Sequence, residues 1–137
     1  MRPETRRLAG LLLIILPTVM YGGLSLLAML VHDPNYMANP LRQNLWRAGH
    51  AHAGVLLVLS LVALRYVDDA ALSSGWAWIA RACIPIAAVL MPLGFFLSVV
   101  SPTAQVPNAF IYSTYLGAGF LTLGVLVLGI GLLRSRA

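Results

Sequence analysis

The sequence predicts an all-α fold, an integral membrane bundle of four transmembrane helices. Of the 137 residues, 60% are hydrophobic and only 9% are charged. A soluble domain normally carries about a quarter charged residues, so this chain has too few charges to cover a soluble surface. Its apolar residues fall into four runs, each long enough to cross a hydrocarbon core of about 30 Å. We expect residues 1–137 to form one domain.

The four runs differ in the residues that interrupt them. The first is about 24 residues long, too long for the apolar region of a signal peptide, and is interpreted as a spanning helix. It contains Pro17 and the pair Gly22-Gly23, which predict a kink or a close helix contact. The third contains Pro85 and Pro92, and the fourth contains five glycines. The expected spans are residues 8–31, 45–66, 77–100 and 109–133.

Short polar segments connect these spans. The segment from His32 to Asn35 is typical of a turn. Asn39 followed by Pro40 predicts a helix N-cap with proline at the first helical position, so the second helix is expected to begin before the membrane does. Asn108 is the corresponding candidate cap for the fourth helix.

The basic residues gather on one side of the predicted spans. Only Arg42 and Arg47 lie on the other side. Because cytoplasmic segments of membrane proteins carry an excess of basic residues, we expect a multi-pass cell-membrane protein with both termini cytoplasmic. Arginines at the ends of apolar runs contact lipid headgroups, so the net charge of +5 does not indicate a nucleic-acid partner. The seven on the cytoplasmic side are Arg2, Arg6, Arg7, Arg65, Arg81, Arg134 and Arg136.

Polar side chains concentrate near the extracytoplasmic ends of the spans. His50 and His52 open the second span, and a histidine in hydrocarbon is costly unless it has a partner. Positions two apart on a helix point about 200° apart, so the two histidines cannot bind one metal from the same helix. A functional site is therefore expected around one of them.

Haem b is the cofactor that these residues favour. A zinc site needs three or four protein ligands and has weaker support here, whereas haem needs one axial ligand and a slot between helices. His52 can supply the imidazole, and its small neighbours Gly49 and Ala53 leave room for a flat macrocycle. Arg47 can pair with a propionate, and His50 is a further candidate contact. The absence of C-x-x-C-H excludes c-type attachment.

Each of these residues also has a purely structural interpretation. A membrane histidine can hydrogen-bond to a neighbouring helix, here to Tyr112 or Ser98. Tyr112 and Tyr115 are pocket candidates, but tyrosines at span ends are more often interface anchors. Arg47 taken alone is typical of a headgroup contact. With no carboxylate inside the spans, a proton relay or ion-coupled transport is not favoured.

The segment around His52 resembles that of a known family. Trp46, Arg47 and then His52-Ala53-Gly54 are similar to the W-x-R-x-H-S-G segment of styrene oxide isomerases, which are small four-helix membrane proteins. Residues 94–102 resemble the family's G-F-Y-L-F-S…S-P segment, and residues 106–108 its G-P-N turn. The resemblance covers most of the chain through short motifs. It implies haem b at the subunit interfaces of a homotrimer, with His52 as the axial ligand to iron.

The resemblance also implies an activity. In this family ferric iron acts as a Lewis acid on an epoxide oxygen, so the implied ligand is a small apolar epoxide. The family's substrate tyrosine corresponds to Phe96 and its catalytic asparagine to Val58. Losing one positioned polar group typically costs a factor of about 10² to 10⁴ in rate. The resemblance therefore supports the haem site more than the isomerase chemistry, and Phe96 is kept only as a pocket candidate.

Three functions stay open from the sequence. The first is a haem-dependent epoxide isomerase, and the second is a haem protein for electron transfer or gas binding. The third is a haem-free assembly subunit, suggested by the small residues in the spans. A second axial ligand, His50 or His32 of a neighbouring subunit, would favour electron transfer over catalysis.

Overall fold

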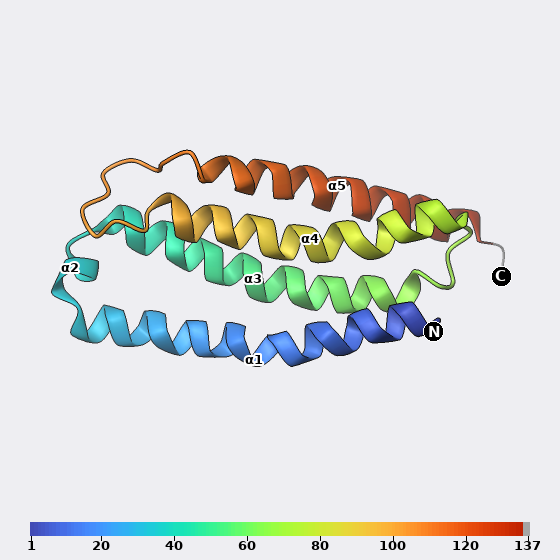
Figure 1. The fold of residues 1–137 in the computed structure, drawn as a ribbon, viewed down its shortest axis with the longest axis horizontal. Helices are drawn as coiled ribbons and strands as arrows, with labels where there is room; N and C mark the ends of the chain where they lie inside the picture. Colours follow the sequence, from blue (N-terminus) through green and yellow to red (C-terminus); the bar gives the residue numbers. More distant parts are fainter. Residues whose placement is uncertain (136–137) are drawn as a thin grey trace.

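The computed structural model describes residues 1–135, and within them the fold is all-α, with no strand (Figure 1). Four helices are long and apolar enough to span a membrane. This confirms the predicted fold of four transmembrane helices in a multi-pass membrane protein. The elements are α1 (Pro3–His32), the single-turn α2 (Pro34–Met37), α3 (Pro40–Tyr66), α4 (Ser74–Ser98) and α5 (Ile111–Arg134).

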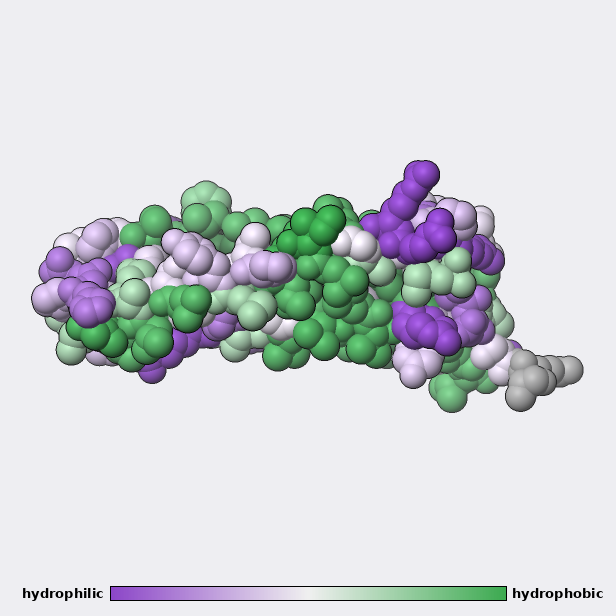
Figure 2. Space-filling model, turned by 90° about the horizontal axis from the view of Figure 1, so that it is seen from below, coloured by the Kyte–Doolittle hydropathy of each residue, from purple (hydrophilic) through white to green (hydrophobic). Residues whose placement is uncertain are grey.

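The long helices pack in series, so the bundle is open. α1 packs mainly against α3, α3 against α4, and α4 against α5, as the order of the ribbons in Figure 1 shows. The start of α1 and the end of α5 lie at the same end of the molecule, here called the terminal end; the opposite end, which carries α2, is called the α2 end. Hydrophobic surface covers the middle of the molecule and hydrophilic residues lie towards both ends (Figure 2), as expected for a protein that contacts a lipid bilayer.

The helix boundaries confirm one sequence prediction about helix ends and correct two others. α3 begins at Pro40 and Asn39 caps it, because the Asn39 side chain accepts a hydrogen bond from the backbone N–H of Arg42 at 3.1 Å, as predicted. The predicted turn after His32 is instead the short α2. Asn108 does not cap α5: its Oδ1 accepts from the N–H of Phe110 at 2.9 Å, which forms a turn before the helix begins at Ile111.

Glycines lie at close contacts between α4 and α5. A Cβ added at Gly94 would lie 2.6 Å from the backbone nitrogen of Thr114 and 3.1 Å from the carbonyl oxygen of Phe110. Gly117 faces α4 in the same way, since an added Cβ would lie 3.0 Å from the Met91 nitrogen. Small residues at these positions let the two helix backbones come together.

Gly94→Ala is therefore expected to destabilise the protein by about 1–3 kcal/mol, because the clash is with backbone atoms that no side-chain rotation can move. The matched control is Gly119→Ala, where an added Cβ meets nothing within 4 Å. Unfolding of the detergent-solubilised variants, followed by circular dichroism, measures the difference. Equal stability of the two variants would show that α4 and α5 are not in contact at Gly94.

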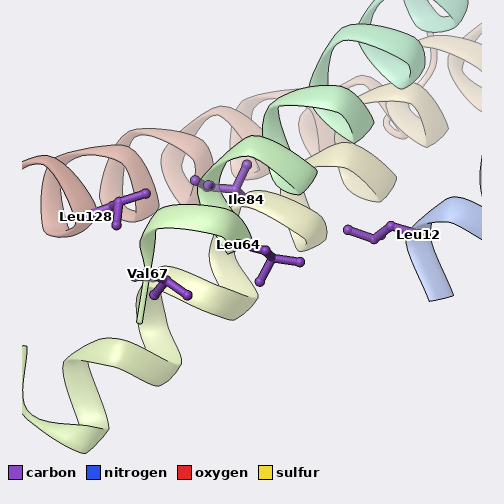
Figure 3. Close-up of a cluster of buried hydrophobic side chains, with 7 residues drawn as sticks. Leu12, Leu64, Val67, Ile84 and Leu128 are labelled. Atoms are coloured by element: carbon purple, nitrogen blue, oxygen red, sulfur yellow. The ribbon is translucent and has the colours of Figure 1, made fainter. Parts of the chain in front are cut away.

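The terminal end holds a hydrophobic cluster to which all four long helices contribute. Figure 3 shows Leu12 of α1, Leu64 of α3, Ile84 of α4 and Leu128 of α5, with Val67 directly after α3. α1 leaves most of its apolar side chains exposed along the rest of its length. The cluster therefore fixes α1 to the bundle chiefly at this end.

A buried ion pair lies beside this cluster. Arg81 of α4 is only 1% exposed, which contradicts the expectation that it contacts headgroups. Its Nη2 donates to Asp68 Oδ1 at 2.8 Å and its Nε to Thr5 Oγ1 at 2.8 Å. Asp68 also accepts from the backbone N–H of Arg2 at 2.6 Å. These bonds join the start of α1, the α3–α4 connection and α4.

Asp68 makes the stability of this end depend on pH. Burial by itself raises the pKa of Asp68, but the hydrogen bonds from Arg81, Arg2 and Thr5 and the charge of Arg81 bring this pKa below its ordinary value of 3.8. A carboxylate whose pKa is lower in the folded protein than in the unfolded chain stabilises the folded state. This stabilisation is complete above the pKa of the unfolded chain, and it is lost as the pH falls through the pKa of the folded protein.

We therefore expect the stability difference between the wild type and Asp68→Asn to stay constant from neutral pH down to about pH 4 and to shrink below it. Chemical unfolding at a series of pH values measures this difference. A difference that already shrinks between pH 7 and about pH 5 would contradict the depressed pKa.

Candidate functional site

His50 and His52 point to different neighbours, as their spacing on one helix predicts. The His52 ring packs against Phe95 of α4, with the ring centroids 5.0 Å apart. His50 instead contacts α1, where a Cβ added at Gly23 would lie 2.9 Å from its Nε2. The two imidazoles therefore belong to two different environments.

The hydrogen bond of His52 defines its tautomer. Nδ1 lies 2.7 Å from the carbonyl oxygen of Ala48, one turn earlier on α3. A carbonyl oxygen only accepts, so Nδ1 carries a proton, and in the neutral imidazole Nε2 then keeps its lone pair. This is the arrangement that metal-ligating histidines use, in which the hydrogen bond of one ring nitrogen orients the other. The alternative of a bond to Ser98 is not observed, since the Ser98 hydroxyl donates to the Phe95 carbonyl at 3.1 Å.

His52 lies at a lateral surface of the bundle. It is half-buried, and Val55, the next residue one turn along α3, is exposed. Leu59 and Ala63 follow at helical spacing on the same stripe of α3, and both line an apolar pocket of about 180 Å³ that α4 and α5 complete. This pocket begins two turns along α3 from His52, and His52 itself does not line it.

Arg47 is grouped with His50 and not with His52. Its side chain donates to Gln43 Oε1 and lines a pocket of about 240 Å³ that also contains His50 and Tyr36. Residues 47 and 50 are three apart and share a helix face, whereas residues 47 and 52 do not. Within one chain, the structure therefore does not bring the predicted propionate partner to the predicted axial ligand.

The pocket candidates are also dispersed. Phe96 packs between α3 and α4: a Cβ added at Gly49 would lie 3.0 Å from its ring, and its carbonyl accepts from Trp46 Nε1 at 3.1 Å. Tyr112 and Tyr115 are 70% and 67% exposed on α5, with their rings 6.2 Å apart. This exposure matches the interpretation of both tyrosines as interface anchors.

Sequence reasoning missed a polar network that fixes the α2 end. Arg42 is buried, its Nε donates to the carbonyl of Val99 at 3.1 Å, and its guanidinium lies 4.3 Å from the centroid of the Trp46 ring. Asn39 Nδ2 donates to the carbonyls of Pro102 and Ala104 at 3.1 and 3.0 Å. The spacing of Arg42 and Trp46, four residues apart on one helix face, was the signal available in the sequence.

In the part of the chain that the structure describes, no three His, Cys, Asp or Glu side chains come together as a metal-ligand cluster. Comparisons of the chain with protein-family models, with curated proteins and with solved structures gave no match.

Proposed function

We propose that this chain is a cell-membrane protein that binds haem b, with Nε2 of His52 as the axial ligand to iron. The observation that carries the proposal is the hydrogen bond of 2.7 Å between His52 Nδ1 and the Ala48 carbonyl. That bond leaves Nε2 free to bind iron and orients the ring, as outer-shell partners do for metal-bound histidines. The resemblance of residues 46–54 to styrene oxide isomerases supports the same assignment.

The surroundings of His52 suit an apolar macrocycle bound between subunits. Ala48 and Ala51 are small, and Phe95 packs against the imidazole. The nearby apolar pocket, at about 180 Å³, is smaller than the roughly 300–1,000 Å³ of ordinary ligand pockets. A second copy of the chain would supply the other wall, and the resemblance implies a trimer.

The placement of His50 favours an open sixth coordination position. Its ring is packed against Gly22 and Gly23 of α1, so it faces away from the lateral surface that carries His52. This arrangement disfavours His50 as a second iron ligand, whereas His32, at the exposed end of α1, stays a candidate from a neighbouring copy. Ferric haem bound here would supply a Lewis acid for the oxygen of a small apolar epoxide.

This chain's own residues would position such a ligand by shape. Val55 and Phe95 flank His52 with hydrocarbon, which excludes water and admits a ligand from the lipid. Phe96 is held against Gly49 and Trp46 and has no hydroxyl to donate, and Val58 is exposed on α3. We therefore expect weaker selectivity and slower turnover than in enzymes that carry polar groups at these positions.

The distribution of arginines supports an orientation with both termini in the cytoplasm. Arg6, Arg7, Arg65 and Arg134 all lie at the terminal end, whereas Arg42 and Arg47 lie at the α2 end. By the positive-inside rule, the terminal end is cytoplasmic. His52 then lies in the extracytoplasmic half of the membrane.

An absorption spectrum of protein purified from haem-supplemented cells tests the proposal. We expect a Soret band in the ferric state and a shift of that band when carbon monoxide is added to the ferrous state, because the sixth position is open. A Soret band without a response to carbon monoxide would indicate a second axial ligand and favour electron transfer. Colourless protein would favour the haem-free assembly subunit.

Incubation of the haem-loaded protein with styrene oxide, with assay for phenylacetaldehyde, tests the reaction. Product that depends on both the haem and His52 supports the isomerase assignment. No turnover by haem-loaded protein would exclude this substrate and leave haem binding to be judged from the spectrum.

A further inference from the structure

The pocket at the α2 end has two chemically different walls. α1 contributes an apolar wall made of Gly23 and three leucines. α2 and α3 contribute a polar wall made of Tyr36, Arg47 and His50. The pocket is open to the outside and has a volume of about 240 Å³, and the lining leucines are Leu26, Leu27 and Leu30.

Tyr36, one of the residues that line this pocket, has a buried hydroxyl without a partner. Tyr36 is only 1% exposed, and its hydroxyl makes no hydrogen bond to any residue that the structure describes. The ring packs against Trp46 with the centroids 5.8 Å apart, and the Tyr36 carbonyl accepts from Gln43 Nε2 at 3.0 Å. Buried polar groups in folded proteins are almost always paired, so a ligand that accepts this hydrogen bond would satisfy it.

The charge on this wall is also uncompensated. Within residues 1–135, Arg47 forms no ion pair, and its side chain bonds only to Gln43. No acidic residue lines the pocket. An imidazole, a guanidinium and a phenol can all donate hydrogen bonds. The matching ligand group is therefore an anion with oxygen acceptors.

We propose that this pocket binds an anionic amphiphile, whose carboxylate or phosphate head contacts Arg47, His50 and Tyr36 and whose acyl chain lies on the leucines of α1. The pocket lies near the α2 end, where α3 leaves the apolar part of the molecule, so lipid headgroups are within reach. Two sources share this chemistry, a free fatty acid and an anionic phospholipid. The site is separate from His52, which contacts α4.

Quenching of Trp46 fluorescence by brominated lipids tests the proposal, because Trp46 packs directly against Tyr36. The full-length protein with Trp76 and Trp78 replaced by phenylalanine is placed in phosphatidylcholine vesicles. A minor fraction of the lipid is dibrominated stearate, dibrominated phosphatidylglycerol or, as the neutral reference, dibrominated phosphatidylcholine. We expect at least one anionic probe to quench Trp46 with about tenfold higher relative affinity than the neutral probe, the gain typical of a charge-assisted hydrogen bond.

Two variants test the named contacts. Arg47→Gln should abolish the preference for the anionic probe, whereas Arg65→Gln, an exposed arginine of the same helix that pairs with Asp69, should leave it unchanged. Tyr36→Phe keeps the ring and its packing. It should weaken anionic binding several-fold and raise the melting temperature of the delipidated protein, because it removes an unsatisfied buried hydroxyl. A hydroxyl that served only the fold would instead lower that temperature when removed.

The outcomes separate the two sources. Preference for the stearate probe alone assigns the site to free fatty acids, preference for phosphatidylglycerol alone assigns it to phospholipids, and preference for both supports the shared chemistry. Equal quenching by anionic and neutral probes would overturn the proposal, as would an anionic preference that persists unchanged in Arg47→Gln.

Discussion

Asp68→Asn is expected to lower the free energy of unfolding by about 3–5 kcal/mol, the usual loss when one partner of a buried ion pair is removed. The amide keeps the size of the side chain but leaves the buried Arg81 guanidinium without its counter-charge. The contacts that Asp68 makes with Arg2 and Thr5 weaken at the same time. The start of α1 should therefore detach before the rest of the bundle unfolds.

Asp69→Asn is the matched control for this variant. Asp69 and Arg65 form an ion pair of 3.2 Å, but their side chains are 62% and 68% exposed. An exposed pair of this kind contributes at most about 1 kcal/mol. Denaturant unfolding in detergent, followed by circular dichroism, compares the two variants. If Asp68→Asn and Asp69→Asn unfold at the same denaturant concentration, Arg81 does not depend on Asp68 in the folded protein.

His52→Ala is expected to remove haem completely, because no other histidine lies on that face of α3. The Soret absorbance of protein from haem-supplemented cells should vanish, and added imidazole should restore it by occupying the space left by the side chain. His32→Ala, at the exposed end of α1, should keep the full absorbance. A Soret band that survives His52→Ala and is lost in His50→Ala would place iron on the α1 side of α3 and contradict the assignment.

The four spans were predictable because hydropathy and length depend on local sequence alone. The start of α3 was also predictable, since Asn39 and Pro40 act within one helical turn. The role of Arg81 was not, because its partners Thr5 and Asp68 lie 76 and 13 residues away in the chain. An arginine near a span end has the same local sequence whether it faces lipid headgroups or a buried carboxylate.

The candidate site was predictable only in part, for a similar reason. The spacing of residues on a helix places His50 and His52 on different faces of α3. The same spacing places Arg47 on the face of His50. The hydrogen bond between His52 and Ala48 also follows from their spacing. The contact of His52 with Phe95 depends on how α4 packs against α3. The contact of His50 with Gly23 depends on how α1 packs against α3. No local pattern specifies that packing.

An experimental density map of the protein purified from haem-supplemented cells tests the central assignment most directly. We expect porphyrin density at the lateral surface of α3, with iron bonded to Nε2 of His52 while Nδ1 keeps its bond to the Ala48 carbonyl. Density for only lipid or a protein side chain at that nitrogen, or a porphyrin held by a different residue, would contradict it.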